Sequence, residues 1–394
     1  MRFRHPDGST VHLSYCTNVH PAEDLDGVIA QLESCAALVR TELGVPVLGV
    51  GLWLAHDLAA RLVQEPTALK RLGDTLDRHS LEVVTLNGFP YAGFHDEVVG
   101  KSVYLPDWSQ PERLEYTLNL AEVLARLLPA DAQYGSISTL PLGWRTPWFA
   151  DREEMAREAF RAVANRLEEI RDRTGRLIRV AIEPEPGCVI ETVAQAGQWL
   201  SSYDEAVRAQ IGVCVDTCHL AVQFEDPGEV LPVLDEGGVT VVKSQVSAAL
   251  HVAEPADPEA QRLLAEFAEP KFLHQTREAG GRRLRGVDDL IDTLPPASRP
   301  LPGRHPWRVH FHVPVHAEPL PPLAASTDVL DQSLQQLVGR EHPQTHHLES
   351  ETYTWSVLPE GLRPENNAEL AAGIAAELGW LRDRLVSLGL EEIA

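Results

Sequence analysis

Three stretches of the chain, RLIRVAIEP (176–184), AQIGVCVDT (209–217) and GGVTVVKSQ (237–245), share one pattern. Each is a short run rich in β-branched and other apolar residues, and each ends in polar residues. A strand that is covered by helices on both faces is almost continuously apolar, as these runs are. Between them lie segments with apolar residues at three- and four-residue spacing, which is typical of amphipathic helices. The pattern predicts parallel strands in repeated strand–helix units.

The same unit recurs along the chain. The predicted strands are Val11–Thr17, Val47–Leu52, Leu81–Leu86, Tyr134–Thr139, Arg179–Pro184, Ile211–Asp216, Val239–Gln245 and His346–Thr352. The predicted helices include Ala22–Leu43, Pro111–Leu128, Arg152–Asp172, Val193–Arg208 and a final one at Ala368–Leu388. Eight such units close into a (β/α)8 TIM barrel. A doubly wound open sheet is the rival, but no glycine-rich phosphate turn follows any of the strands.

The regular repeat breaks after Gln245, since roughly a hundred residues separate it from the last strand, far more than a normal strand–helix connection needs. This interval holds a predicted helix, two possible hairpin strands, a proline-rich loop and a further strand. They are, in order, Pro258–Phe267, Lys271–Gln275, Arg282–Leu284, Pro295–Pro306 and Trp307–Val313. We interpret residues 248–306 as an insertion on the catalytic face of one domain that spans residues 1–394. The alternative is that Trp307–Val313 is itself a barrel strand.

The composition excludes several classes of protein. The 394 residues carry 34 Lys and Arg against 58 Asp and Glu, a formal charge of −24. Such a surface repels phosphate backbones, which argues against a nucleic-acid partner. No apolar run approaches the roughly 20 residues that span a bilayer, and no signal peptide is visible at the N-terminus. The 5 cysteines lie in apolar runs rather than in a disulfide framework, so we expect a cytoplasmic protein.

In a TIM barrel the active site lies at the C-terminal ends of the strands. The residues at these ends are rich in carboxylates, imidazoles and amides. They are Asn18, His20, Trp53, Asn87, His95, Thr139, Glu183, Glu185, Asp216, His219, Gln245, His310, His312, Glu349 and Glu351. We therefore expect a polar site that is built from several strands.

Glu183 and Asp216 end neighbouring predicted strands, so their carboxylates are expected side by side. An unpaired buried carboxylate is unstable, and a divalent cation relieves the repulsion between two of them. The alternative is that both residues cap the following helices. Glu at a strand end is a poor cap, which favours a metal site.

Two further segments add candidates. In HHLESETYTW (346–355), Glu349 and Glu351 share one strand face, and Glu351 is nearer the C-terminal end. Glu349 either binds substrate or forms a salt bridge in a layer inside the barrel. In WRVHFHVPVH (307–316), His310 and His312 also share a face, and their role is either functional or structural.

The segments Thr85–His95 and Val103–Trp108 are rich in aromatic residues and turn residues. They are predicted to form a lid over the mouth of the barrel, with Asn87, His95 and Trp53 as substrate-binding residues. The alternative is a well-packed loop with no contact to a ligand.

Eight strings, taken in order, resemble the EboE family of metabolite traffic proteins. They are LSYCTNVHP (13–21), TLNGFPYAGFH (85–95), SVYLPDW (102–108), GSISTLPLGW (135–144), CVDTCHLAVQFED (214–226), FLHQ (272–275), VHFHVPV (309–315) and HLESETYTWSVLP (347–359). The resemblance runs from about Leu13 to the last helix, nearly the full chain. That family is a branch of the xylose isomerase-like, or sugar phosphate isomerase/epimerase, barrels.

The resemblance implies one divalent metal ion (Mn, Mg, Co or Zn). Its ligands would be Glu183, Asp216, Gln245 and Glu351, with Gln245 in the place where the superfamily has a histidine. His312, or His274 of FLHQ, is a candidate to replace that histidine. Glu183 and Glu351 would transfer protons, and His219 would orient the substrate, which His310, His312 and Glu349 also contact.

The implied function is isomerisation or epimerisation of a sugar- or cyclitol-like metabolite in a secondary-metabolite pathway, whose other proteins are possible partners. One alternative is a non-catalytic protein that binds and delivers the metabolite, which the glutamine at position 245 favours. A metal-dependent hydrolase is the weaker alternative.

Overall fold

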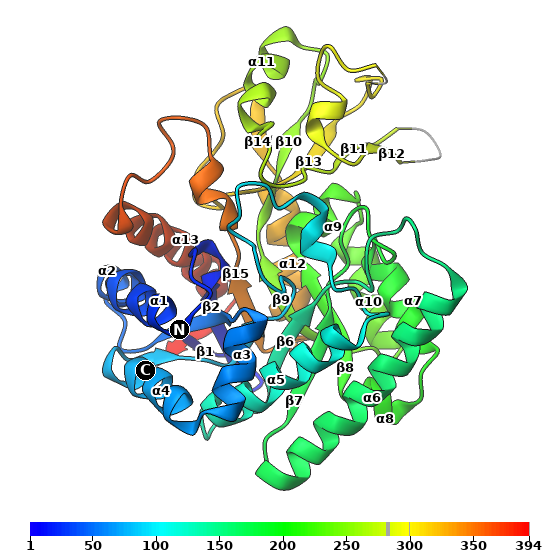
Figure 1. Ribbon diagram of the computed structural model, residues 1–394. Helices are drawn as coiled ribbons and strands as arrows, with labels where there is room; N and C mark the ends of the chain where they lie inside the picture. Colours follow the sequence, from blue (N-terminus) through cyan, green and yellow to red (C-terminus); the bar gives the residue numbers. More distant parts are fainter. Residues whose placement is uncertain (281–283, 299, 394) are drawn as a thin grey trace.

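The computed structural model describes residues 1–280, 284–298 and 300–393, and within them a ring of eight parallel strand positions forms the centre of the molecule (Figure 1). The strands are β2 (Thr10–Cys16), β3 (Leu48–Trp53), β4 (Leu81–Glu82) continued by β5 (Thr85–Asn87), β6 (Gly135–Thr139), β7 (Ile178–Ile182), β8 (Ile211–Asp216), β9 (Val241–Val246) and β15 (His347–Ser350). β2 pairs in parallel with both β3 and β15, which closes the ring. The predicted TIM barrel is confirmed.

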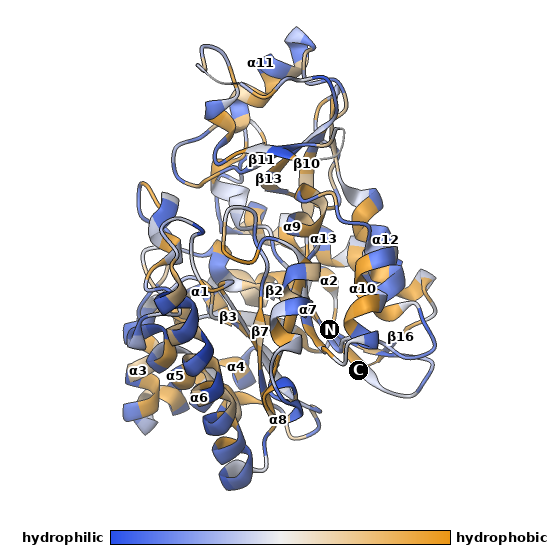
Figure 2. Ribbon diagram, turned by 90° about the vertical axis from the view of Figure 1, so that its right-hand side faces the viewer, coloured by the Kyte–Doolittle hydropathy of each residue, from blue (hydrophilic) through white to orange (hydrophobic). Residues whose placement is uncertain are grey.

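Helices surround the ring, with their polar faces outward (Figure 2). They are α1 (Leu25–Gln31), α2 (Ala37–Leu43), α3 (His56–Gln64), α4 (Pro66–Arg78), α5 (Pro111–Leu127), α6 (Ala150–Thr174), α7 (Val193–Ser201), α8 (Glu205–Arg208), α9 (Thr217–Val222), α10 (Pro227–Glu236), α12 (Thr327–Val338) and α13 (Asn367–Ser387). The helix expected at Val193–Arg208 is two helices, because the Asp204 side chain accepts the Val207 N–H and starts α8 as a new helix. None of the helices described is long and apolar enough to cross a membrane.

A second sheet lies above the C-terminal ends of the barrel strands (Figures 1 and 2). It is antiparallel and contains β10 (Ala248–Val252), β11 (Thr276–Glu278), β12 (Arg285–Val287), β13 (Trp307–Val313) and β14 (Leu323–Ala325), with α11 (Pro258–Phe267) packed beside it. At the edges of the barrel sheet, β1 (Arg2–Arg4) pairs with β2 and with β16 (Glu391–Ile393).

The second sheet excludes one alternative for the insertion and differs from one of its predicted bounds. β13 pairs antiparallel with β10 and β11, so Trp307–Val313 belongs to the second sheet and is not a barrel strand. The second sheet continues to Ala325, beyond the expected end at residue 306. The expected strand at 271–275 is displaced to β11, and the one at 282–284 lies largely outside the described residues. The extent of the domain, 1–394, stays a prediction.

An ion pair lies inside the barrel, below the site. The Lys243 ammonium contacts the Glu349 carboxylate, and neither side chain is exposed. Lys243 comes from β9 and Glu349 from the neighbouring β15. A Cβ atom at Gly51 on β3 would overlap the Glu349 carboxylate. Glycine at position 51 thus leaves the space that the buried carboxylate fills.

Replacing Gly51 with alanine is expected to lower the free energy of unfolding by about 1–3 kcal/mol, because the added methyl group must displace a paired, buried carboxylate. Gly73→Ala is the matched control. Its Cβ meets nothing within 4 Å in the middle of α4, so a small gain of up to about 1 kcal/mol is expected there. Urea unfolding of both variants measures the difference. Equal stabilities would contradict this account of the barrel interior.

Candidate metal centre

A pocket at the C-terminal ends of the barrel strands encloses about 60 Å³. Its lining contains both polar side chains and aromatic or aliphatic ones. The polar lining comprises Asn18, Asn87, Glu183, Glu185, His219, His310, His312 and Glu351. The rest comprises Phe89, Pro90, Phe94, Val99, Gly100, Val103, Tyr104, Phe272, Leu273 and Tyr353. The second sheet contributes two of the imidazoles through β13.

Three buried carboxylates converge here, and two of them, Glu183 and Glu351, line the pocket. Glu183 follows β7, Asp216 ends β8, and Glu351 follows β15. Each offers an oxygen atom, and these atoms all lie within 4.8 Å of one another. Asp216 Oδ1 accepts hydrogen bonds from the His219 N–H and the Ser247 hydroxyl, each at 2.9 Å. Asp216 Oδ2 and Glu183 Oε2 are buried and have no hydrogen-bond partner among the described residues.

Asp216 is thus both a helix cap and a member of the cluster. Its Oδ1 satisfies the start of α9, which confirms the capping interpretation for this residue, and its Oδ2 faces the cluster. The two interpretations made from the sequence are compatible, because a carboxylate has two oxygen atoms for two tasks.

The electrostatics of the cluster are unfavourable without a cation. Burial, followed by the charges of the neighbouring carboxylates, raises the pKa of Glu183 and of Glu351 well above their ordinary value. Burial also acts to raise the pKa of Asp216, but the imidazoles of His219 and His312 outweigh it and lower that pKa. Among the described residues, no Lys or Arg forms an ion pair with any of the three.

Glu351 is oriented by two amides. The Nδ2 atoms of Asn18 and Asn87 donate to Glu351 Oε1 at 2.7 and 2.8 Å. Asn87 lies at the end of β5, and Asn18 follows β2. With Oε1 occupied, the second oxygen of Glu351 is the one left for a ligand.

His312 is the imidazole nearest to Asp216 Oδ2. Its Nε2 lies 3.8 Å from Asp216 Oδ2 and has no hydrogen-bond partner among the described residues. Its Nδ1 lies 2.6 Å from the Glu351 carbonyl oxygen, which can only accept, so Nδ1 carries the proton and Nε2 presents a lone pair. This arrangement is typical of metal-binding histidines, whose second nitrogen donates to a carbonyl or a carboxylate.

Gln245 lies beside the cluster, on β9. It is opposite Asp216 in the strand register and fully buried. Neither atom of its side-chain amide has a partner among the described residues. The oxygen of this amide is therefore available as a metal ligand.

These residues fit a divalent cation. The orphaned atoms are two carboxylate oxygens, an imidazole nitrogen with a lone pair, and an amide oxygen. Oxygen with one or two nitrogen donors is a donor set that Mn²⁺, Co²⁺ and Zn²⁺ accept. A bound cation would compensate the buried negative charge that otherwise has no partner.

Residues of the aromatic segment 85–108 line the pocket. Trp53 and His95, which were predicted to bind substrate, are not among the lining residues. Trp53 is outside the pocket lining and donates from Nε1 to the Pro90 carbonyl at 2.9 Å. His95 is also outside it and hydrogen-bonds through Nε2 to the Asn18 carbonyl at 2.7 Å. Both residues make hydrogen bonds that anchor the lid, and their predicted contact with a substrate stays a prediction. A sequence does not show whether a tryptophan or a histidine near the barrel mouth contacts a ligand or anchors the lid.

Glu349 is not a pocket residue either, because it is paired with Lys243 inside the barrel. Of its two predicted roles, the structural one agrees with this position. Conversely, Glu185, Asn18 and Tyr104 line the pocket without having been assigned a role. Glu185 lies two residues after Glu183, so the alternation of a strand could have indicated that both face the barrel mouth.

The comparisons with known proteins agree with the fold. The sequence profile described as xylose isomerase-like TIM barrel matches residues 18–277. D-Allulose 3-epimerase from Methylomonas sp. has 10% identity over 95% of this chain and 98% of its own, with a TM-score of 0.51. The structure of that enzyme in complex with D-allulose has 10% identity over 95% and 97%, with a TM-score of 0.50.

An L-ribulose 3-epimerase structure has 11% identity over 96% of this chain and 95% of its own, with a TM-score of 0.50. No curated protein sequence matches the chain significantly. At such low identity these likenesses concern the fold.

Proposed function

Because the chain belongs to the xylose isomerase-like TIM barrel family, we propose that it is a divalent-metal-dependent isomerase or epimerase. The observation that carries the proposal is the convergence of the buried carboxylates of Glu183, Asp216 and Glu351, of which Glu183 and Asp216 each have an oxygen atom without a hydrogen-bond partner among the described residues. Glu183, Asp216, Glu351 and His312 would hold the metal ion, with Gln245 available as a further oxygen donor. A bound cation polarises a carbonyl oxygen and stabilises negative charge that develops on it.

The chain's own residues suit proton transfer next to such a carbonyl. Burial raises the pKa of Glu183 and Glu351 above the ordinary value, and a carboxyl group with a raised pKa is suited to accepting and returning a proton. We propose that one of them removes the proton from the carbon beside the carbonyl and the other returns it. Asn18 and Asn87 position Glu351 for this role. His219 lines the same pocket and would orient a substrate oxygen.

The substrate that we propose is a sugar- or cyclitol-like metabolite. The pocket lining combines hydrogen-bonding groups with aromatic side chains such as Phe94, Phe272 and Tyr353. Its volume of about 60 Å³ is well below the roughly 300 Å³ of a typical ligand site, so we propose that the lid moves when a sugar enters. Phe94, on the lid, packs edge-on against Tyr353, so the lid closes over the pocket by aromatic contacts.

We further propose that the chain is an EboE-type metabolite traffic protein within this family, and that it acts in a secondary-metabolite pathway. The strings that support this proposal lie on the lid, at the strand ends and on β13, where a shared substrate would be recognised. The cytoplasmic location remains a prediction. It is supported by the five free cysteines, because a reducing compartment keeps thiols unpaired.

The test is hydrogen exchange on candidate substrates. Protein loaded with Mn²⁺ is incubated in D₂O with D-allulose, D-fructose, L-ribulose and a ketocyclitol, and NMR follows the proton beside each carbonyl. At least one compound is expected to exchange, and Glu351→Gln is expected to slow the exchange by about 100-fold or more. Glu225→Gln, whose carboxylate accepts N–H groups at the start of α7 outside the pocket, is the control and is expected to keep the rate.

Two results would contradict the proposal. Full exchange in Glu351→Gln would remove that residue from proton transfer. Tight binding of Mn²⁺ and a sugar, with no exchange on any compound, would instead indicate a metabolite-delivery protein.

A further inference from the structure

Three side chains surround one part of the pocket. An oxygen of Glu185 and one nitrogen each of His219 and His310 all lie within 4.8 Å of one another. All three residues line the pocket, and the Nε2 atoms of the two imidazoles are 3.0 Å apart. What this group can bind depends on which of these atoms carry protons.

The His219 imidazole presents a lone pair to the group. Its Nδ1 lies 2.9 Å from the Pro184 carbonyl oxygen. A carbonyl oxygen can only accept a hydrogen bond, so Nδ1 carries the proton and Nε2 has none.

The His310 imidazole also presents a lone pair, because a chain of hydrogen bonds fixes its proton. The Tyr104 hydroxyl donates to Glu185 Oε1 at 2.7 Å, so its oxygen is left to accept from Gln275 Nε2 at 3.0 Å. The oxygen of the same amide, Gln275 Oε1, therefore faces His310 Nδ1 at 2.7 Å, and this Nδ1 is the donor. His310 Nε2 consequently has no proton.

Two lone pairs thus meet beside a carboxyl group in a buried place. This arrangement is repulsive unless a hydrogen-bond donor or a positive charge lies against it. A primary ammonium group supplies both, because it has one positive charge and three N–H donors, one for each of Glu185, His219 and His310. A nitrogen about 2.8–3.0 Å from each acceptor fits over a triangle of this size.

We infer that the pocket recognises a protonated primary amine, held by Glu185, His219 and His310, and that the substrate is therefore an amino sugar or an aminocyclitol. This inference rests on the proposed function and deepens it, since it names the class of substrate. His219 would then bind the amine in place of the oxygen of a neutral sugar. Its Nε2 lies 4.0 Å from Asp216 Oδ2, so the amine would lie next to the proposed metal centre.

The charge of the pocket favours a cationic ligand. Glu183, Glu185, Asp216 and Glu351 are each at most 5% exposed, and no Lys or Arg is among the described residues that line the pocket. One divalent ion carries two positive charges against these four carboxyl groups, and an ammonium group adds a third. A phosphate or carboxylate on the ligand would instead add negative charge to a site that is already rich in it.

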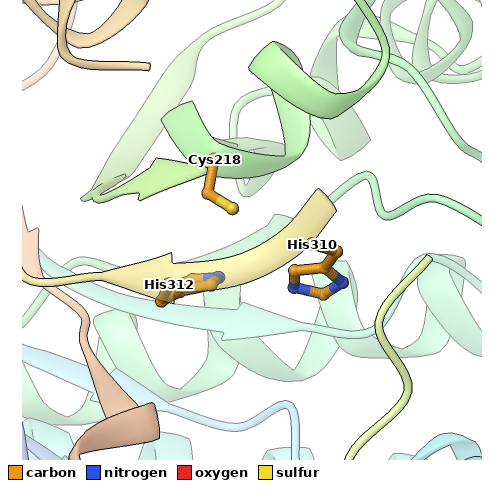
Figure 3. A group of neighbouring side chains, drawn as sticks. All are labelled: Cys218, His310 and His312. Atoms are coloured by element: carbon orange, nitrogen blue, oxygen red, sulfur yellow. The ribbon is translucent and has the colours of Figure 1, made fainter. Parts of the chain in front are cut away.

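The second sheet supplies part of this group. Figure 3 shows that His310 and His312 both extend from β13, and Gln275 directly precedes β11. The Cys218 thiol lies near the same imidazoles, but burial and then the nearby carboxylates raise its pKa well above its ordinary value, so it adds no negative charge. The insertion thus contributes directly to the choice of substrate.

The experiment compares matched pairs of ligands on the full chain loaded with Mn²⁺. The pairs are D-glucosamine with D-glucose, D-fructosamine with D-fructose, and scyllo-inosamine with scyllo-inositol, and calorimetry measures each dissociation constant. In at least one pair the amine is expected to bind about 10- to 100-fold more tightly than the alcohol, which is the effect of a hydrogen bond to a charged group. N-acetylation removes the charge and is expected to abolish this preference.

Two variants test the assigned residues. Glu185→Gln and, independently, His310→Ala are expected to reduce the preference for the amine to about threefold or less. Glu225→Gln and His251→Ala are the matched controls, because neither residue is part of the pocket lining, and both are expected to keep the preference.

Each other outcome has a definite meaning. Equal binding of amine and alcohol in every pair, with hydrogen exchange on the neutral sugars, would overturn the ammonium site and leave the proposed isomerase function intact. A proton shared by His219 and His310 would then fill the place. A preference that persists in both Glu185→Gln and His310→Ala would overturn the assignment of these residues. A preference that both variants remove, without exchange on any compound, would support the ammonium site and contradict the isomerase function.

Discussion

Replacing Asp216 with asparagine is expected to weaken Mn²⁺ binding by more than about 100-fold, which exceeds the usual effect of losing a residue that only supports a ligand. Asparagine keeps the shape of the side chain and is a good helix cap, so its Oδ1 can still accept the His219 N–H at the start of α9. The variant loses the negative charge of the orphaned Oδ2, which lies next to His312 and the other carboxylates. Calorimetric titration with Mn²⁺ measures the loss.

Asp204→Asn is the matched control for this substitution. Asp204 caps the short helix α8 as Asp216 caps α9, since its side chain accepts the Val207 N–H, but it is not a member of the carboxylate cluster. We expect this variant to bind Mn²⁺ as the wild type does. If Asp216→Asn bound Mn²⁺ within about threefold of the wild type, less than even a supporting residue usually contributes, Asp216 would not be a ligand.

Replacing Lys243 with methionine is expected to lower the free energy of unfolding by about 3–5 kcal/mol. The reason is that Glu349 would keep a buried charge without a partner, since neither residue of the pair is exposed. Near neutral pH, that carboxylate must either take up a proton or stay unpaired, and both are costly.

The double variant Lys243→Met, Glu349→Leu separates charge from packing. It removes both charges, and we expect it to recover most of the stability, because well-packed apolar residues often replace a buried ion pair without loss. Urea unfolding of the wild type, the single variant and the double variant provides the comparison. A loss below about 1 kcal/mol in Lys243→Met, the range of an exposed pair, would contradict the buried pairing.

The barrel could be predicted from the sequence because its signal is local and repeated. Runs such as that of β8 are apolar throughout, and the helices between them have regular apolar faces. The second sheet was harder to predict, since β11, β12 and β14 have only three residues each. Strands this short carry no visible alternation, and their pairing depends on contacts that are distant in the sequence.

The site also has one part that could be predicted from the sequence and one part that could not. Glu183, Asp216 and Glu351 could be predicted to converge because a barrel places all strand ends at one mouth. The place of His312 could not be settled, since β13 belongs to another sheet, and only its pairing with β10 turns the imidazole toward Asp216. Glu185 lines the pocket, whereas Glu349 is paired with Lys243 inside the barrel. This difference depends on depth in the barrel, which the sequence pattern does not record.

Crystallography of the Mn²⁺-loaded protein, with anomalous data that locate manganese, tests the central claim most directly. We expect a manganese ion bound by oxygens of Glu183, Asp216 and Glu351 and by His312 Nε2, at about 2.0–2.2 Å, the range for such donors on a comparable divalent ion. Manganese bound elsewhere would contradict the claim. So would a structure without a bound ion in which these carboxylates point away from one another.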